Sequence, residues 1–470
     1  MPLLCASFVS KDKAHNTSYD DDNTMTLGTY RTILLAVGDV AVFWFSLVIT
    51  LFIRYGAEKF LDNFAIHILP FGVVFAVWIL VFYITGLYEV RIIGKSEQLF
   101  KYLTYATLSG GIIAIALFYF VPAFTITPRT NLILDIIVTF AIMLCWRSLF
   151  AYAGRSTDKM RVLLVGSSPD IDELARTIED YPYLGYTIKA RCPEVTPHIL
   201  ELVSKHHIDI VVASKDNQTN DTLLQTLYEA LHRGIRFVDV SVFYEMILGR
   251  IPVSLISKVW FLENIAETEK LFFETSKRGM DIFFAIILGI PTIVLMPFVA
   301  LAIRLDSRGP IFIRQQRVGR MGKAFTLLKY RTMLALNPDG SAETHGAEWS
   351  QEGDVRITAV GKILRSTRID ELPQAWNILR GELSFIGPRP ERPEFVGNLR
   401  KNIPYYDMRH LIRPGLSGWA QINPPYYYAS HDDTILKLQY DLYYIKNRDL
   451  GLDLSIALKT LMVMLSRQGR

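Results

Sequence analysis

The sequence is poor in the residue types that build disulfide frameworks and protein-only metal sites. Its 470 residues include nine histidines and three cysteines, Cys5, Cys145 and Cys192. The cysteines are widely scattered, with neither a pairing pattern nor a metal-ligand spacing, which fits a reducing compartment. The histidines form no ligand cluster. The composition therefore argues against a disulfide-stapled fold and against a histidine–cysteine metal centre.

The start of the chain lacks the apolar core of a cleavable signal peptide. The first 25 or so residues are polar overall and include Asp20, Asp21 and Asp22, so we predict a disordered tail over residues 1–28. A strong net charge is also absent, since the formal value is +4, and no nucleic-acid partner is expected.

Long apolar runs are abundant instead, and hydrophobic residues make up 50% of the chain. Each run is close to the roughly 20 residues that a helix needs to cross a bilayer. Four of them lie in the predicted membrane domain, 29–155, at about 32–53, 66–85, 103–121 and 132–152. Lysine and arginine are more frequent between the second and third runs and after the fourth, which favours both termini in the cytoplasm. Asp39 and Asp135 lie inside two runs, where function, packing and snorkelling all remain open.

A small α/β domain is expected over residues 156–270. Strand patterns at 161–166, 208–213 and 236–239 alternate with helix patterns at about 171–178 and 221–233. The turn after the first strand, Gly166-Ser-Ser-Pro-Asp170, lacks the second and third glycines of a dinucleotide fingerprint. We therefore predict a degenerate Rossmann-like domain with a structural or regulatory role rather than nucleotide binding.

A fifth apolar run, residues 282–303, carries no charge at all. Basic residues lie on both sides of it, and Pro291 and Pro297 interrupt it. Because flanking cations favour the cytoplasmic side and proline bends a helix, we predict a re-entrant helix over 278–305 that returns on the side it entered. Either proline could form the bend, and the alternative is a kinked full crossing.

A basic stretch follows this run. It contains Arg304, Arg308, Arg314, Arg317, Arg320, Lys323, Lys329 and Arg331, and only one acid, Asp306. Beside a membrane segment these cations are expected to meet anionic lipid, although some could instead hold substrate phosphates. Near the C-terminus, residues 454–466 have an amphipathic helix pattern, which fits the membrane interface and the protein core equally well.

The most informative stretch is residues 365–393, where two adjacent carboxylates lie among arginines. A helix tolerates Pro373 only in its first turn, so a helix carrying Leu372, Trp376 and Leu379 should begin near residue 369 or 370. Asp370 and Glu371 then lie at its N-terminus, where carboxylates are expected to stay ionised. Such a pair can bind a metal or attack an electrophile, although a solvated acidic cap is the simpler interpretation of an isolated Asp-Glu.

Further motifs surround this pair in a fixed order. They are Lys329-Tyr-Arg331-Thr-Met, Arg365…Asp370-Glu-Leu-Pro-Gln374, Gly387-Pro-Arg-Pro390 and Arg413-Pro-Gly-Leu-Ser-Gly-Trp-Ala-Gln421. Together they resemble the signature of the bacterial sugar transferases, the polyprenyl-phosphate glycosyl-1-phosphate transferases. Tyr330 replaces the usual phenylalanine, a conservative change. The resemblance implies a four-helix transmembrane bundle, a degenerate α/β domain and a monotopic α/β catalytic domain over 271–470.

The resemblance also implies the reaction: a sugar-1-phosphate moves from a UDP-sugar to polyprenyl (undecaprenyl) phosphate in the bacterial inner membrane, and UMP is released. Asp370 would form a covalent phosphosugar intermediate, and Glu371 with Asp370 would hold Mg²⁺. The expected substrate-binding residues are, by motif position, Lys329, Arg331, Arg365, Arg389, Arg413 and Asp441. Lys329, Arg331 and Arg365 are expected to bind the diphosphate, and Arg389 is expected to contact the nucleotide. For each of them the alternative is an ion pair that positions the carboxylates.

Two other functions remain open from the sequence. An NAD-linked sugar-modifying enzyme built on residues 161–240 would need the glycine fingerprint that is missing. The other is a non-catalytic scaffold for exopolysaccharide, capsule or O-antigen assembly. The intact carboxylate motif argues against it, because a scaffold would not need that motif. By analogy with large family members, a homodimer through residues 161–270 is also expected. Nothing in the sequence distinguishes glucose, galactose or an N-acetylated hexose as the sugar.

Overall fold

The computed structural model describes residues 25–88, 96–120, 129–156, 159–193, 199–213, 228, 235–265, 271–337, 341–342, 354–423 and 431–465. By contacts the chain divides into two compact units. One comprises the described residues up to Leu80 and from Tyr88 to 156, and the other comprises almost all of 159–465. Most of the predicted tail, 1–24, lies outside the described residues. The predicted domain boundaries within the second unit stay predictions, because contacts join its parts.

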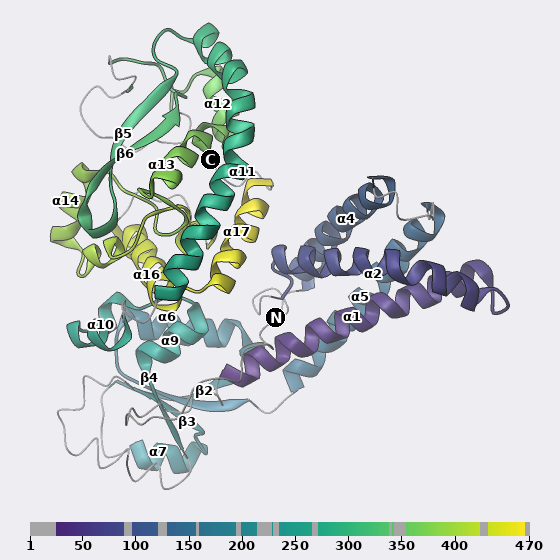
Figure 1. Cartoon of the computed structure of the whole chain (residues 1–470). Helices are drawn as coiled ribbons and strands as arrows, with labels where there is room; N and C mark the ends of the chain where they lie inside the picture. Colours follow the sequence, from purple (N-terminus) through teal and green to yellow (C-terminus); the bar gives the residue numbers. More distant parts are fainter. Residues whose placement is uncertain are drawn as a thin grey trace. The chain divides into compact units, whose positions relative to one another are not determined.

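The first unit consists of four long helices, drawn from purple to blue in Figure 1. They are α1 (Met25–Tyr55), α2 (Phe60–Ile84), α4 (Ser96–Phe120) and α5 (Arg129–Ser156). Each contains a stretch that is long and apolar enough to cross a membrane. These helices overlap the four apolar runs of the sequence, and α5 packs against both α1 and α4.

Both acids within these helices join α1 to α5. Asp39 of α1 forms an ion pair with Arg147 of α5, and both side chains are almost fully buried. Asp135 of α5 accepts hydrogen bonds from Ser46 Oγ at 3.0 Å and Thr50 Oγ1 at 3.4 Å, both on α1. These contacts favour packing over snorkelling, because each acid has its partners on the facing helix.

A parallel sheet with strand order β2-β1-β3-β4 forms the α/β part of the second unit. Its strands are β1 (Met160–Val165), β2 (Tyr186–Cys192), β3 (Ile210–Ala213) and β4 (Arg236–Asp239). The helices are α6 (Pro169–Asp180), α7 (Ile199–His206), α9 (Val240–Leu248) and α10 (Lys258–Asn264), with 3-10 turns η1 (Pro182–Leu184) and η3 (Val253–Leu255). The predicted helix at 221–233 lies, apart from residue 228, outside the described residues.

The first turn of α6, where a parallel α/β sheet would place a pyrophosphate, is used for contacts within the chain. Ser254 donates to Asp170 in this turn, and Arg250 pairs with Glu173 one turn later. Tyr244 also donates to Glu173, at 2.8 Å. These acids and their partners suit a structural role, since a phosphate there would meet two carboxylates.

The catalytic part, as predicted from the motifs, follows from α11 onward. Its strands are β5 (Phe312–Val318), β6 (Ala324–Tyr330), β7 (Ser384–Ile386) and β8 (Gly415–Ser417). Its α-helices are α11 (Leu271–Asp306), α12 (Ala359–Ser366), α13 (Ala375–Arg380), α14 (Pro393–Asn402), α15 (Trp419–Ile422), α16 (His431–Asn447) and α17 (Leu450–Leu465). The 3-10 turns are η5 (Arg320–Gly322), η6 (Ile369–Gln374) and η7 (Tyr406–His410). β5 and β6 form an antiparallel hairpin, and β7 pairs in parallel with β8.

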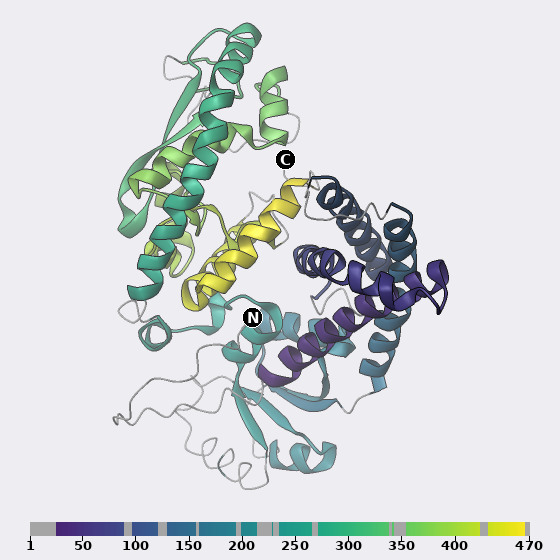
Figure 2. The same ribbon diagram turned by 45° about the vertical axis from the view of Figure 1, so that its right-hand side comes forward.

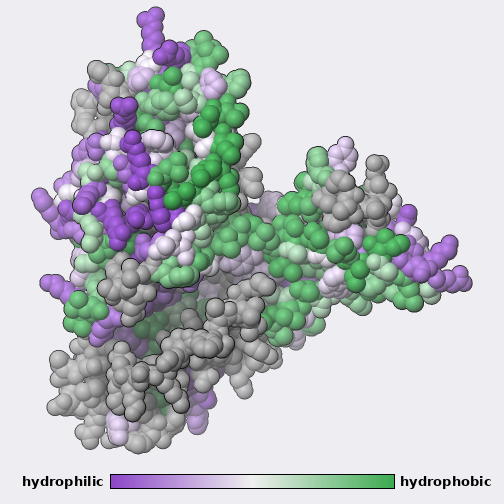
Figure 3. Space-filling model, in the orientation of Figure 1, coloured by the Kyte–Doolittle hydropathy of each residue, from purple (hydrophilic) through white to green (hydrophobic). Residues whose placement is uncertain are grey.

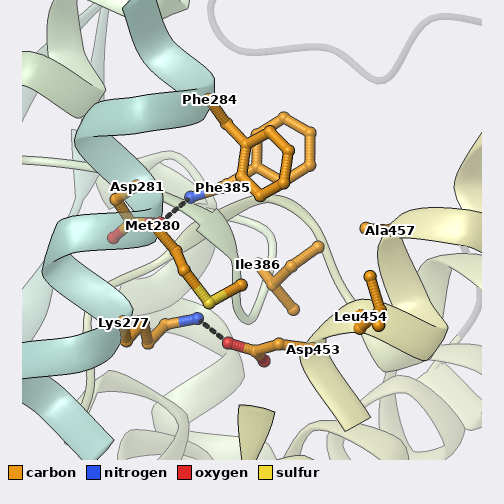
Figure 4. Close-up of a pocket in the computed structure, with 9 residues that line it drawn as sticks. All are labelled: Lys277, Met280, Asp281, Phe284, Phe385, Ile386, Asp453, Leu454 and Ala457. Atoms are coloured by element: carbon orange, nitrogen blue, oxygen red, sulfur yellow. Dashed lines mark hydrogen bonds and ion pairs between the residues drawn. The ribbon is translucent and has the colours of Figure 1, made fainter. Parts of the chain in front are cut away.

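One face of α11 is anchored to this catalytic part by polar contacts near its start. Lys277 Nζ donates to Asp453 Oδ2 of α17 at 2.6 Å, and Asp281 Oδ1 accepts from the backbone N–H of Phe385 in β7 at 2.8 Å (Figure 4). Arg278 donates to the carbonyls of Ile378 and Leu379 at the end of α13. The side chains in Figure 4 line a cavity of about 10 Å³, which is the space of roughly one water.

Further along α11, Val299 and Ile303 pack with Tyr330 and Leu364. The opposite face is exposed and apolar, and it forms a hydrophobic strip in Figure 3. It includes Phe283, Ile286, Ile287, Ile290, Ile293, Val294, Phe298, Leu301 and Leu305. α11 is continuous through Pro291 and Pro297 and does not turn back on itself in Figures 1 and 2. A bend at either proline therefore stays a prediction.

Gly361 lets α12 approach the segment after β6 at backbone distance. A Cβ added there would lie 2.0 Å from the carbonyl oxygen of Thr332, whereas one added at Gly397 of α14 would meet nothing within 4 Å. We expect Gly361→Ala to destabilise the protein by about 1–3 kcal/mol, because backbone must move to admit the methyl group. Thermal or denaturant unfolding in detergent measures this. The matched Gly397→Ala should be neutral or slightly stabilising, and equal stability of the two variants would contradict the close approach.

Candidate active site

The two adjacent carboxylates lie where the sequence placed them, at the start of a helix. η6 begins at Ile369 and continues into α13, with Pro373 inside η6. The residue before η6, Arg368, adopts the left-handed conformation with φ of 58°. The apolar stripe of the sequence faces outward, since Trp376 is 53% exposed and Leu379 37%. Ala375, Asn377 and Ile378 form the buried face of α13 instead.

Glu371 is buried and gathers cations from three separate segments. Its Oε1 lies 2.9 Å from Arg389 Nη2, 3.3 Å from Lys329 Nζ and 3.9 Å from Arg368 Nη1. Burial alone would raise the pKa of Glu371, but the attraction of these three cations outweighs it and holds the pKa well below its usual range. Glu371 is thus a permanent anion that joins β6, η6 and the turn after β7.

Asp370 is buried to a similar extent but has a different environment. Its Oδ1 has no hydrogen-bond partner among the described residues. Burial, followed by repulsion from Glu371, raises the pKa of Asp370 to about 6 against the attraction of Lys329, Arg368 and Arg365. Desolvation thus exceeds the effect of one short 3-10 turn on the pKa of Asp370, although a carboxyl with a pKa of about 6 is still mostly ionised at neutral pH, as expected. The two acids have pKa values pushed in opposite directions, as in many acid–base sites.

Three further predicted residues lie around this pair. Lys329 on β6 is only partly exposed, and desolvation lowers its pKa although Glu371 opposes the shift. Arg365 on α12 is close enough to lower the pKa of Asp370. Arg389 follows β7 and reaches Glu371. Three regions distant in the sequence therefore meet at the two carboxylates: β6, the stretch from α12 to η6, and the turn after β7.

Arg331 is not brought to the carboxylates. Its side chain is 2% exposed and caps the turn after α11. Its guanidinium donates from Nε to the carbonyl of Pro310 at 2.7 Å, from Nη1 to Ser307 Oγ at 2.9 Å and from Nη2 to the Ser307 carbonyl at 2.8 Å. These contacts fit a residue that fixes the exit of α11 rather than one that contacts a diphosphate.

Asp441, through Arg409, and the backbone of Arg413 lie against the Gly387-Pro-Arg-Pro390 turn. Asp441 Oδ2 lies 2.8 Å from Arg409 Nη2, which donates to the carbonyl of Arg389 at 3.0 Å. Burial raises the pKa of Asp441 to about 6, with Glu391 adding repulsion and Arg409 opposing it. The Arg413 carbonyl lies against Gly387, where an added Cβ would be 2.6 Å away. The Asp441 contacts favour a positioning role, whereas substrate contact by the Arg413 side chain stays a prediction.

Sequence reasoning missed residues that hold the site together. Arg368 touches Glu371, and Arg409 supports Arg389, but neither stood out among the many arginines. Asn377 fastens α13 to β6, since its Oδ1 accepts from Leu328 N at 3.1 Å and its Nδ2 donates to the Thr326 carbonyl at 2.7 Å. The left-handed backbone of Arg368 and the buried amide have no signal in a single sequence.

The carboxylates also fit a magnesium ion that arrives with a phosphate substrate. No cluster of three or more histidine, cysteine or acidic residues occurs within the described ranges. Magnesium commonly binds through one or two carboxylates together with substrate phosphates and water. Asp370, with an oxygen that lacks a partner, and the adjacent Glu371 match that donor set.

Comparisons with known proteins agree with these features. The model of the family described as bacterial sugar transferase matches residues 272–467. A UDP-N-acetylgalactosamine-undecaprenyl-phosphate N-acetylgalactosaminephosphotransferase of Aeromonas hydrophila is 39% identical over 52% of this chain and 60% of its own length. A UDP-glucose:undecaprenyl-phosphate glucose-1-phosphate transferase of Klebsiella pneumoniae is 30% identical over 64% of this chain and 67% of its own length.

A further relative, a UDP-glucose:undecaprenyl-phosphate glucose-1-phosphate transferase of Caulobacter vibrioides, is 38% identical over 40% of this chain and 70% of its own length. The chain thus spans less than two thirds of the Aeromonas relative, but more than two thirds of the Caulobacter protein.

Because Glu371 contributes to the raised pKa of Asp370, we can predict how Glu371→Gln changes that pKa. The substitution removes the like charge and releases Lys329 and Arg389, so the pKa of Asp370 should fall below about 6. Carbon-13 NMR of aspartate-labelled protein measures this, with Asp370→Asn assigning the resonance. Asp441 serves as an internal control, because its raised pKa depends on other neighbours and should not move. An unchanged Asp370 titration would mean that burial alone sets it.

Proposed function

Because this chain belongs to the bacterial sugar transferase family, we propose that it transfers a sugar-1-phosphate from a UDP-sugar to undecaprenyl phosphate and releases UMP. The observation that carries the proposal is the pairing of two unlike carboxylates. Asp370 has a buried oxygen with no hydrogen-bond partner in the part of the chain that the structure describes, and Glu371 beside it is held by cations. One acid is therefore available for chemistry, while the other fixes the residues around it.

Asp370 is the proposed nucleophile. Its carboxylate oxygen attacks the β-phosphorus of the UDP-sugar, the bond from that phosphorus to the bridging oxygen breaks, and UMP leaves with the electron pair. An oxygen of undecaprenyl phosphate then attacks the same phosphorus, and the Asp370 carboxylate is released. Two displacements replace one between mutually repelling anions. The raised pKa of Asp370 makes the carboxylate more basic, yet it remains largely deprotonated above pH 6.

Lys329, Arg365 and Arg389 supply positive charge where the diphosphate would lie. Glu371 holds Lys329 and Arg389 in place before substrate binds, which lowers the cost of organising them. Asp370 and Glu371 would hold Mg²⁺, which neutralises charge on the phosphoryl oxygens when bound. Asp441 and Arg409 keep the Arg389 turn at the correct distance.

The proposal also includes attachment to the bacterial inner membrane, with the catalytic part in the cytoplasm. The four helices of the first unit would span the bilayer, and α11 would enter it without crossing. Contacts near both ends of α11 support this placement. Arg278, near its start, donates to the Ile378 carbonyl of α13, and Ile303, near its end, packs with Leu364 of α12. A helix anchored at both ends cannot carry one end to the far side. Its exposed apolar strip would lie in the hydrocarbon, with Arg304 and Arg308 at anionic headgroups.

Replacing the nucleophile tests the chemistry. We expect Asp370→Asn to abolish UMP release from the UDP-sugar while the protein still inserts, since an amide cannot form the intermediate. Asp370→Glu should also fail, because the attacking oxygen is displaced. A sugar-labelled UDP-sugar should leave a hydroxylamine-sensitive adduct on the wild type alone. Asp172→Asn, an exposed change on α6, is the control. Wild-type rates of UMP release from the Asp370→Asn variant would refute the assignment.

Labelling tests the placement of α11. In a background without Cys5, Cys145 and Cys192, cysteines at Gly279 and Arg308 should react with a membrane-impermeant reagent from the same side. Gly279 is suitable because an added side chain meets nothing within 4 Å, and the Arg278 contacts are retained. Glu58→Cys, in the loop between α1 and α2, should react from the opposite side. Opposite labelling of positions 279 and 308 would show a full crossing.

A further inference from the structure

The cations around the carboxylates come from two directions. Arg365 on α12 and Arg368 before η6 belong to segments that pack against α11. A second group surrounds the turn that carries Arg389, and it consists of Arg317 on β5 and Arg392 at the start of α14. The proposed chemistry above gives no task to this second group.

Arg317 points toward the same side of the β5–β6 hairpin as Lys329. Strand register pairs Ile313 with Lys329 and Arg317 with Phe325, and residues two or four apart on a strand share a face. Arg317 Nη1 donates to the carbonyl of Pro390 at 3.1 Å, and Nη2 donates to Gln315 Oε1 at 2.9 Å. Its Nε is buried and has no hydrogen-bond partner among the described residues. One donor of a buried guanidinium therefore remains unused beside the Arg389 turn.

Three arginines, Arg317, Arg389 and Arg392, lie close together in this region. Burial lowers the pKa of Arg317 to about 10, and repulsion from Arg389 and Arg392 adds to the effect, against attraction by Glu391 and Glu371. Arg392 is only 15% exposed and lies 3.4 Å from the exposed Glu394. Arginines held together at a cost in electrostatic energy are typical of sites that receive an anion.

Arg317 lies away from the C-terminal end of α11, although its cross-strand partner Phe325 packs with Ala285 nearer the start of that helix. Phe312, at the start of β5, packs in the cluster of Val299 and Ile303 from α11. Arg317 is five residues further along the strand, which is about 16 Å at 3.3 Å per residue. Arg317 also donates to the turn that carries Arg389, the residue expected from the motifs to contact the nucleotide, so the anion that meets Arg317 is expected to arrive with the soluble substrate. In the proposed reaction that anion is the nucleotide.

We propose that Arg317, with Arg392, forms a subsite for the α-phosphate of the UDP-sugar, the phosphate that leaves with UMP. This inference rests on the proposed function and adds to it a residue that acts in the nucleotide half-reaction. The unused Nε of Arg317 provides a donor, and Arg389 links the subsite to Glu371. Arg317 would then act in the first displacement, whereas the lipid phosphate attacks only after UMP has left.

Two measurements on the full-length protein test the assignment. The first half-reaction alone is followed by exchange of labelled UMP into the UDP-sugar without lipid, and the full reaction gives the KM for undecaprenyl phosphate. Arg317→Gln should slow exchange by about tenfold or more, because a charge-assisted contact to phosphate is lost. The KM for the lipid phosphate should change less than about twofold. Arg317→Lys should recover part of the exchange, and Arg400→Gln, an exposed change on α14, should match the wild type.

Ligand binding separates phosphate contact from simple positioning of the Arg389 turn. UMP should bind the wild type more tightly than uridine, and Arg317→Gln should remove most of this difference while uridine binding stays the same. Equal weakening of UMP and uridine, or a raised KM for the lipid phosphate, would overturn the subsite. A wild type that shows no UMP exchange would instead refute the proposed function, whereas normal exchange in Arg317→Gln would refute only this inference.

Discussion

The Glu371 carboxylate is the interaction on which the arrangement of the site depends. Burying a carboxylate next to a single cation would cost desolvation free energy. Here three cations, Lys329, Arg389 and Arg368, lie around Glu371. Each cation comes from a different segment, so the carboxylate fixes β6, η6 and the turn after β7 relative to one another. Asp370, its neighbour, gains its unusual basicity from the same burial and from the adjacent charge. One acid thus organises the site and at the same time prepares the other for reaction.

Contacts on α11 extend this organisation to the helix that would lie in the membrane. Arg278 binds carbonyls at the end of α13, which continues the η6 turn that carries the carboxylate pair, and Asp281 binds β7, which leads to Arg389. Lys277, in the same turn of α11, donates to Asp453 of α17 and Tyr444 of α16. Less than two turns of one helix therefore contact both segments that supply the reactive acid and its cationic partner. A helix fixed in this way sets the depth of the site relative to its own apolar strip.

The α/β part joins the catalytic part through α16, within the second unit. Lys446 on α16 pairs with Glu245 of α9 at 2.7 Å, and Trp419 Nε1 donates to the carbonyl of Gly249 at 2.9 Å. The same helix carries Asp441, which supports Arg409 and through it the Arg389 turn. The α/β part thus contributes to the support of the site, while the first turn of its α6 is taken by contacts within the chain.

The sequence by itself determined the elements with strong local signals. Apolar runs of membrane length gave the long helices, Pro373 placed the start of η6, and the motif order gave the family and the carboxylate pair. Only the tertiary structure decided which arginines meet that pair. Arg331 looked equivalent to Lys329 in the sequence, yet it caps the turn after α11, whereas Arg368 and Arg317 approach the site. The reason is physical: a side chain's charge is local information, but its partners and its desolvation depend on segments brought together by folding, and these set the pKa of Asp370.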